Sequence, residues 1–345
     1  MARVILNTLY VMTQNSYLHL ENDTLRVDVE REKKLQVPLH HLGSVVCLGN
    51  IMISPALMHR CADEGISLVL LDHNGRFKAR LEGPVSGNIF LRQAQHARAL
   101  EETFALQMAQ AMIAGKLRNA RQILLRGARE ADDEQDSKIL SNAAESLAIS
   151  VRNLPLAANL DVVRGIEGDA AKLYFGALPS LVRKNVREHF TMDGRTRRPP
   201  RDRFNALISF LYSMVMNDCR SALESVGLDP QLGFLHAVRP GRAALALDLM
   251  EEFRAILADR LALTLINRGQ ISAHDFAERE GGAVLLEGDA RRTVVVAYQE
   301  RKQEEVMHPL LETKVPIGLL PLMQARFMAR TLRGDMEGYL PFLYR

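Results

Sequence analysis

The chain has 345 residues, of which 47% are hydrophobic and 25% are charged, and its formal net charge is +3. This length suggests about two domains, and the composition excludes a disordered chain. A net charge this small does not identify a nucleic-acid partner, and no apolar run reaches the roughly 18 residues of a membrane span.

The N-terminal sequence interleaves apolar and polar residues, whereas a signal peptide has an unbroken apolar segment before a small-residue cleavage site. We therefore expect a cytoplasmic protein that does not enter the membrane. The three cysteines, Cys47, Cys61 and Cys219, lie far apart in apolar stretches. This spacing predicts reduced thiols in the core rather than disulfides or a zinc site.

Up to about Leu81, short segments alternate apolar and polar residues with a period near two, which is the pattern of strands. The segment 54–65 differs, because Ser54 is a plausible helix N-cap and Pro55 suits the first helical position. Residues 1–85 are therefore predicted to form a small β-rich domain with one short helix. The expected strands are VILNTL (4–9), SYLHL (16–20), LRVDV (25–29), SVVCLG (44–49), ISLVLL (66–71) and RFKARL (76–81).

Beyond this region the sequence changes to long stretches with a period near 3.6, rich in Ala, Leu, Arg, Glu and Gln. This pattern indicates helices almost to the C-terminus. A short β-hairpin is expected where GAVLLEG and RRTVVVA flank Asp289-Ala290. Residues 86–345 are thus predicted to form a larger all-α domain, which makes the fold class α+β. The expected helices span about 89–115, 117–130, 133–152, 158–178, 202–224, 247–268 and 316–333.

Glu167 lies between Gly165 and Gly168 in the helical segment VVRGIEGDAAKLYFGAL. A glycine inside a helix costs about 1 kcal/mol relative to alanine, and a buried carboxylate needs a partner or a metal to offset its desolvation. The two glycines share one helical face, so another helix or a nucleic-acid backbone could approach beside the carboxylate. The alternative is tight helix packing with Glu167 in an ion pair.

The segment GLDPQLGFLHAVRPGRAALALDLMEEFR carries His236 in an apolar patch and then Asp248, Glu251 and Glu252 on one face of a helix. Carboxylates together with an imidazole suit Mg²⁺ or Mn²⁺, and three protein ligands leave positions for water and a phosphate oxygen. Geometry alone permits either Asp248 or Glu251 as a ligand. The alternative is that these acids only complement the helix dipole, while His236 is an ordinary core histidine.

A basic segment, residues 183–203, holds eight Lys and Arg residues against three acidic ones. A solvated loop is the commonest explanation of such a segment. Beside a metal site, however, a cationic loop can neutralise and position the phosphates of a nucleic acid.

Three segments, GIEGDAAKLYF, RPPRDRFNALISFLY and GLDPQLGFLHAVRPGRAALALDLMEEFR, resemble, in this order, the motifs of the CRISPR-associated protein 1 family. The N-terminal stretches NTLYVMTQNSYLHLEND and VPLHHLGSVVCLGNIMISPALMHRCADEGISLVLLDHNGRF resemble the β-domain of that family and its type I-C subgroup. The resemblance extends over essentially the whole chain.

The resemblance implies a sandwich-like N-terminal domain that mediates homodimer contacts and a helical catalytic domain. It places the catalytic residues and the ligands of a Mg²⁺ or Mn²⁺ ion on Glu167, His236 and Glu251, with Asp248 as an auxiliary acid. His236 is expected to be a ligand, although a proton-shuttle role stays open. The candidates for DNA contact are Arg183, Lys184, Arg187, Arg195, Arg197, Arg198, Arg201 and Asn205.

The function implied by the resemblance is that of a metal-dependent DNA integrase and endonuclease. Two homodimers would flank a dimer of CRISPR-associated protein 2 in a heterohexameric complex. A 3′-hydroxyl of captured double-stranded DNA would then be joined to a repeat by transesterification. Two alternatives stay open, namely a standalone structure-selective metal nuclease and a non-catalytic DNA-binding scaffold.

Overall fold

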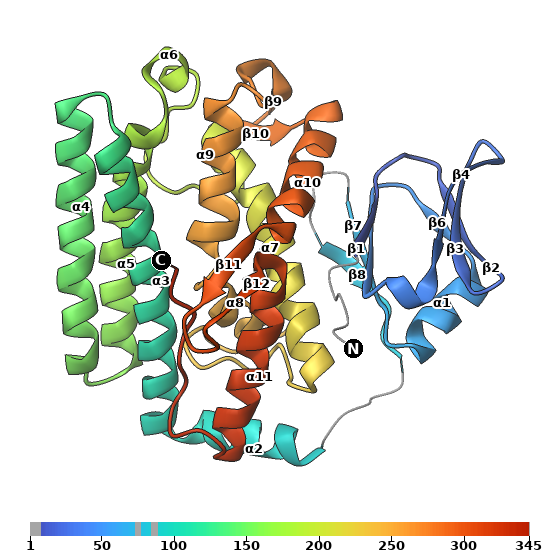
Figure 1. Cartoon of the computed structure of the whole chain (residues 1–345), viewed down its shortest axis with the longest axis horizontal. Helices are drawn as coiled ribbons and strands as arrows, with labels where there is room; N and C mark the ends of the chain where they lie inside the picture. Colours follow the sequence, from blue (N-terminus) through green and yellow to red (C-terminus); the bar gives the residue numbers. More distant parts are fainter. Residues whose placement is uncertain (1–7, 73–76, 84–88, 345) are drawn as a thin grey trace. The chain divides into compact units, whose positions relative to one another are not determined.

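The computed structural model describes residues 8–72, 77–83 and 89–344. The chain divides into two compact units, residues 1–87 and residues 88–345. The first unit is rich in strands and the second is larger and helical (Figure 1). This architecture confirms the α+β fold class.

The described residues of the N-terminal unit form two four-stranded sheets. In one sheet, ordered β1-β5-β7-β8, the first three strands are parallel and β8 is antiparallel to β7. In the other, ordered β4-β3-β2-β6, β3 is antiparallel to both neighbours and β6 is parallel to β2. The strands are β1 (Thr8–Val11), β2 (Tyr17–Glu21), β3 (Thr24–Val29), β4 (Glu32–Pro38), β5 (Ser44–Leu48), β6 (Met52–Ile53), β7 (Ser67–Leu71) and β8 (Phe77–Arg80).

The core of this unit is built from the apolar positions of both sheets and of α1 (Pro55–Asp63). The Ser54 side chain accepts a hydrogen bond of 3.3 Å from the Leu57 amide, which confirms the predicted N-cap. Cys47 and Cys61 are buried free thiols of this core, and Cys219 is a buried free thiol of the second unit. The predicted strand 4–9 lies largely outside the described residues.

The second unit is formed mainly by helices, of which α3, α4 and α5 run side by side (Figure 1). None of the described helices has the length and apolarity needed to span a bilayer. The helices are α2 (Ile89–Leu100), α3 (Glu102–Glu130), α4 (Glu134–Asn153), α5 (Leu160–Ala177), α6 (Lys184–Arg187), α7 (Arg203–Val226), α8 (Ala244–Met250), the π-helical segment η4 (Arg254–Asp259), α9 (Arg260–Asn267), α10 (Gly288–Gln303) and α11 (Leu320–Arg333).

Short elements complete the two units. Two antiparallel hairpins pair β9 (Phe276–Arg279) with β10 (Ala283–Leu286) and β11 (Glu305–His308) with β12 (Thr313–Pro316). The 3₁₀ turns are η1 (Leu39–His41), η2 (Leu154–Leu156), η3 (Leu178–Leu181), η5 (Ala273–Asp275) and η6 (Ile317–Leu319).

Three predicted boundaries are wrong. The expected helix 89–115 is interrupted at Glu101, whose extended backbone separates α2 from α3. The expected break near residue 116 does not occur, because Gly115 continues α3 and serves close packing instead. A Cβ at Gly115 would lie 2.7 Å from Cβ of Pro341. The expected helix 247–268 is divided into α8, η4 and α9, and this wider π-helical geometry starts directly after the acidic cluster.

The predicted hairpin between GAVLLEG and RRTVVVA is also wrong. Residues 283–286 pair with 276–279, and the valine-rich segment belongs to α10. In that helix Val294 and Val295 are buried, so tertiary packing outweighs the strand propensity of β-branched residues.

Candidate active site

Glu167 and Glu251 come from different helices and meet at one lysine. Glu167 lies in α5, and Glu251 caps the C-terminal end of α8. Lys116 of α3 forms an ion pair with Glu167, and its Nζ is 2.8 Å from Oε2 of Glu251. Two acids that are distant in the sequence therefore contact the same ammonium group.

His236 is held next to this point by Asp248. The imidazole Nδ1 donates a hydrogen bond of 2.6 Å to Oδ1 of the Asp248 carboxylate. The other ring nitrogen, Nε2, is 3.9 Å from Oε1 of Glu251. Because Asp248 engages Nδ1, Nε2 is the ring nitrogen that is left for a ligand.

Asp248 has a further structural function, because its carboxylate also organises the loop that carries His236. It is fully buried and accepts the backbone amides of Phe234, Leu235 and His236 at 2.6, 3.0 and 3.0 Å. With both oxygens engaged, Asp248 is suited to orienting the histidine. Between the two open alternatives, this arrangement favours Glu251 as the ligand.

Glu251 is kept ionised in a buried position. Burial raises the pKa of this carboxyl, but Arg254, Lys116 and His236 lower it more strongly, to about 2. Arg254 lies one turn further on, at the start of η4, and its Nη2 is 2.9 Å from Oε1 of Glu251. Neither Lys116 nor Arg254 was among the residues predicted from the sequence.

The donor set fits a hard divalent cation. Two carboxylates share one cation, and a free imidazole nitrogen lies beside them, which is the chemistry that Mg²⁺ and Mn²⁺ accept. Within residues 8–72, 77–83 and 89–344, no group of three His, Cys, Asp or Glu side chains is positioned to hold a metal as it stands. The Lys116 ammonium occupies the place between the carboxylates.

A second buried network supports the site from α5 and α7. The hydroxyls of Tyr174 and Tyr212 donate to the two oxygens of Asp259 at 2.9 and 2.7 Å. Burial raises the pKa of Asp259 to about 6, although the two hydroxyl donors and nearby arginines oppose this shift. Arg254 stacks over the Tyr212 ring at 5.0 Å, which connects this network to Glu251.

Glu252 does not belong to the site, although the sequence grouped it with Asp248 and Glu251. Its carboxyl accepts hydrogen bonds from Tyr339, from Gln324 and from the Phe342 amide. Burial raises the pKa of Glu252 to about 8 in spite of these donors. This acid therefore holds the C-terminal segment.

The structure around Glu167 agrees in part with each of the two interpretations that the sequence left open. The ion pair is present, and the carboxylate is half-buried, with 24% of its side chain exposed. However, a Cβ at Gly165 or Gly168 would meet no atom within 4 Å, so no part of the described chain packs tightly on these glycines. The face beside Glu167 is open to an approaching ligand.

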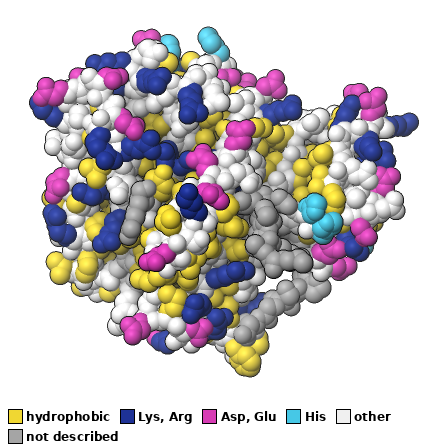
Figure 2. All heavy atoms as spheres, viewed as in Figure 1, with side chains coloured by type: hydrophobic (Ala, Val, Ile, Leu, Met, Phe, Trp, Pro, Cys, Tyr) yellow, Lys and Arg dark blue, Asp and Glu magenta, His cyan; other side chains and the backbone are white. Residues whose placement is uncertain are grey.

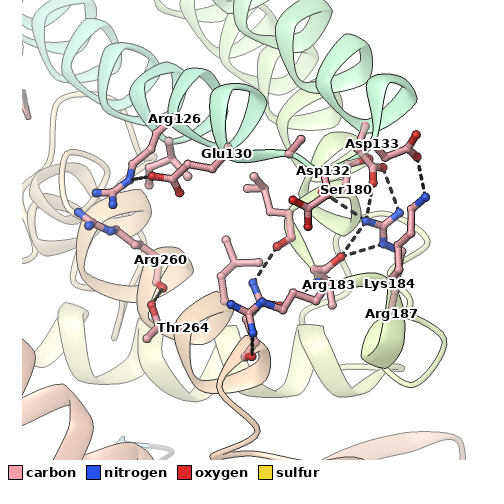
Figure 3. A pocket seen from close by; sticks show the side chains of 18 of the residues that line it. Arg126, Glu130, Asp132, Asp133, Ser180, Arg183, Lys184, Arg187, Arg260 and Thr264 are labelled. Carbon is pink, nitrogen blue, oxygen red and sulfur yellow. Dashed lines mark hydrogen bonds and ion pairs between the residues drawn. The ribbon is translucent and has the colours of Figure 1, made fainter.

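Part of the basic segment is engaged with acids at the junction of α3 and α4. Arg187 forms a two-pronged ion pair with Asp136, at 3.0 and 2.7 Å, and Lys184 pairs with Asp133 at 3.1 Å. Both ion pairs line a pocket of about 800 Å³ to which α3, α6 and α9 contribute. Arg183 also lines this pocket (Figure 3). The ion pair of the partly buried Arg187 indicates a structural function for this residue.

Two further DNA-contact candidates are directed inward. Asn205 is fully buried, accepts from Arg195 and from the Thr196 amide, and donates to Gly194 and Asp202. Arg195 also donates to Ser209, and burial lowers its pKa. Both residues fold the basic loop onto α7. The remaining candidates are exposed, namely Arg183, Lys184, Arg197, Arg198 and Arg201.

A profile of the family described as CRISPR associated protein Cas1 matches residues 9–300. The chain is 56% identical over 342 residues to the CRISPR-associated endonuclease Cas1 1 of Moorella thermoacetica, and the alignment covers 99% of both chains. It is 46% identical over 340 residues to the protein of the same description from Chlorobaculum tepidum, again with 99% of both chains covered.

Solved structures share the fold. A chain of a Cas6-RT-Cas1–Cas2 complex superimposes with a TM-score of 0.83 and 23% identity, covering 99% of this chain and 37% of that one. A casposase bound to its integration product superimposes with a TM-score of 0.81 and 20% identity, covering 97% and 92% of the two chains.

Proposed function

Because this chain belongs to the CRISPR-associated protein Cas1 family, we propose that it is a metal-dependent DNA endonuclease and integrase that acts at Glu167, His236 and Glu251. The main support for the proposal is that Glu167 and Glu251 contact the same ammonium, that of Lys116, next to Nε2 of His236. The relatives of this length are described as endonucleases.

The proposed substrates are a captured double-stranded DNA and a DNA repeat, and the proposed partner is a dimer of CRISPR-associated protein 2. Two homodimers of this chain would flank that dimer in a heterohexamer, with the N-terminal β-rich unit making the homodimer contacts. Support comes from the similar chain in a Cas1–Cas2 complex and from the similar casposase bound to an integration product.

In the joining reaction, a 3′-oxygen of the captured DNA attacks a phosphorus of the repeat. A P–O bond of the repeat breaks, and its 3′-oxygen leaves and takes up a proton from solvent, while the proton of the attacking hydroxyl passes to solvent. Water in place of the hydroxyl gives hydrolysis at the same site. A bound Mg²⁺ or Mn²⁺ would polarise the phosphoryl oxygen and offset the charge that develops on it.

The protein contributes a prepared set of ligands to this reaction. Glu167, Glu251 and the Nε2 atom of His236 would hold the ion, and Asp248 keeps the imidazole in the required tautomer. Arg254 and Lys116 keep Glu251 ionised while it is buried. These contacts fix the ligands before DNA arrives, so little reorganisation is needed during the reaction.

The test uses a supercoiled plasmid with a matching repeat, a labelled short duplex, the purified partner, and Mg²⁺ or Mn²⁺. Glu167→Ala, His236→Ala and Glu251→Ala should each reduce joining by about a hundredfold or more, because each removes a ligand of the ion. Glu145→Ala is the matched control, since this exposed acid of α4 pairs only with Arg152 in the described contacts.

The assay also separates the alternatives. Cleavage without joining would favour a standalone structure-selective nuclease. DNA binding with neither reaction would favour a non-catalytic scaffold. Full activity in the three folded variants would show that the reaction takes place elsewhere.

A further inference from the structure

Lys116 contacts both of the carboxylates that are proposed to hold the ion, a position that keeping Glu251 ionised does not by itself explain. It extends from α3, and its side chain is only 12% exposed. Its ammonium contacts Glu167 and lies 2.8 Å from Glu251, so it binds both carboxylates that would hold the ion. A cation that belongs to the protein thus occupies the position between two proposed metal ligands.

The charges of the site explain why a cation is required there. Two carboxylates that contact the same ammonium lie close enough to repel each other, and this repulsion grows where water is scarce. Glu251 is 3% exposed, so water screens it poorly. Arg254 contacts only Glu251 of the two, at 2.9 Å. Lys116 is therefore the counter-ion that the two acids share.

A divalent ion and this ammonium cannot occupy the same place. Mg²⁺ binds carboxylate oxygens at about 2.0–2.1 Å, which would bring it to within a few ångströms of a nitrogen that contacts the same oxygens. Two cations at such a separation repel each other strongly where water is scarce. The lysine side chain has a flexible four-carbon stem, so the ammonium can move away while α3 stays in place.

We propose that Lys116 is a tethered counter-cation that holds Glu167 and Glu251 together before metal binds and that a divalent ion must displace. The proposal rests on the proposed metal-dependent function and assigns a positioning residue to it. The proposal predicts that Lys116 has opposite effects on protein stability and on metal affinity. Lys116 stabilises the protein without metal, and it weakens metal binding by competing for the same two carboxylates.

The first experiment measures binding of Mn²⁺ to the full-length chain without DNA, by isothermal titration calorimetry. Lys116→Met keeps the length and apolar stem of the side chain but removes the charge. This variant should bind Mn²⁺ about tenfold more tightly or better, because no ammonium competes for the carboxylates. Its melting temperature in chelator should be lower than that of wild type, and its rise on adding Mn²⁺ should be larger.

The matched control is Lys138→Met, which removes an exposed ammonium that pairs with Glu134 on α4. It should leave the Mn²⁺ affinity unchanged. Equal or weaker Mn²⁺ binding by Lys116→Met would overturn the proposal, because Lys116 would then be only a structural ion-pair partner or a support for the ligands.

The second experiment needs no variant at the site. Wild-type protein is treated with an amine-acetylating reagent with and without Mn²⁺, and the modification of each lysine is measured by mass spectrometry. Displacement predicts that Mn²⁺ raises the acetylation rate of Lys116 several-fold relative to that of Lys138. An unchanged or lower rate would contradict displacement.

The two proposals fail in different ways. If wild type binds Mn²⁺ and loses this binding in Glu167→Ala, while Lys116→Met binds no more tightly than wild type, only the role of Lys116 is overturned. If wild type, Lys116→Met and Glu167→Ala show no binding at all, the metal centre itself is overturned, and the displacement with it.

Discussion

Two buried aspartates stabilise the site by different means. Asp248 accepts three backbone amides and the Nδ1 donor of His236, so it determines the loop conformation and the tautomer together. Asp259 accepts the hydroxyls of Tyr174 and Tyr212 and thereby connects α5 and α7 to η4. Fully buried carboxyl groups like these require such donors, because an unpaired one would cost several kcal/mol.

Asp259 should leave a measurable signature in the dependence of stability on pH. Its pKa is raised from 3.8 to about 6 by burial, so the folded state binds a proton more strongly than the unfolded state. The stabilising contribution is fully present below about pH 3.8 and is lost as the pH rises through about 6, with a slope of at most about 1.4 kcal/mol per unit.

Asp259→Asn removes this titration and should flatten the stability profile between about pH 4 and 6 relative to wild type. The measurement is urea unfolding at half-unit intervals of pH. Asp169→Asn, which changes an exposed acid of α5, is the matched control and should follow the wild-type curve. Parallel curves for Asp259→Asn and wild type would show that the carboxyl titrates alike in both states.

At the residue scale, a functional side chain can be predicted from the sequence when its neighbours along the chain are unusual. Glu167 stands between two glycines, and Glu251 lies in an acidic cluster shortly after His236. Lys116 and Arg254 were missed because a lysine or an arginine in an amphipathic helix is usually solvated. Only the packing of α3 against α5 and of η4 against α7 gives these two cations their role.

At the scale of elements, hydrogen bonds fasten the C-terminal segment 339–344 near the site. Asn119 of α3 donates to the carbonyls of Glu252 and Phe342, both at 2.9 Å, and accepts the Tyr344 amide at 2.7 Å. The Phe342 amide in turn donates to the carboxyl of Glu252 at 2.7 Å. The segment thus fixes the residue directly after the proposed ligand Glu251.

Phe342→Ala should lower the free energy of unfolding by about 3–5 kcal/mol, because the side chain is only 1% exposed and its loss leaves a cavity. Urea denaturation is the measurement. The adjacent control is Leu340→Ala, whose side chain is 50% exposed and should change stability by less than about 0.5 kcal/mol. Equal effects of the two substitutions would mean that the segment is not anchored by Phe342.

Elements were predictable from the sequence where local pattern and tertiary packing agree. The helix 133–152 is found as α4 (Glu134–Asn153), with Asp133 as its N-cap. The strand β4 was missed because its charged, exposed residues, such as Glu32, Lys33 and Lys34, obscure the alternation. The valine-rich segment is helical because its buried side chains pack in α10 against other elements, which no local pattern records.

At the scale of the whole molecule, charge is balanced rather than concentrated. The net charge is +3, and on the face drawn in Figure 2 positive and negative side chains are intermixed over the helical unit. Non-specific attraction by the overall field is therefore weak. Affinity for DNA must depend on local groups of cations, of which the exposed part of the basic segment 183–203 is the candidate.

Removing the charges of that group should reduce both the affinity for DNA and its dependence on salt. For each phosphate that the protein no longer neutralises, the slope of log K against log salt concentration becomes shallower by about 0.9, because fewer counterions are released on binding. A filter-binding titration from low to moderate salt measures the slope. The variant replaces five exposed cations by glutamine: Arg183, Lys184, Arg197, Arg198 and Arg201.

The control must lose the same charge elsewhere, so that a local effect is separated from that of net charge. It replaces five exposed cations outside the segment by glutamine: Lys33, Lys34, Lys138, Arg152 and Arg333. If the basic segment binds the backbone of DNA, the first variant has a shallower slope and the control keeps the wild-type slope. If both variants shift the curve alike, the effect comes from the lost net charge, and the segment is only a solvated surface.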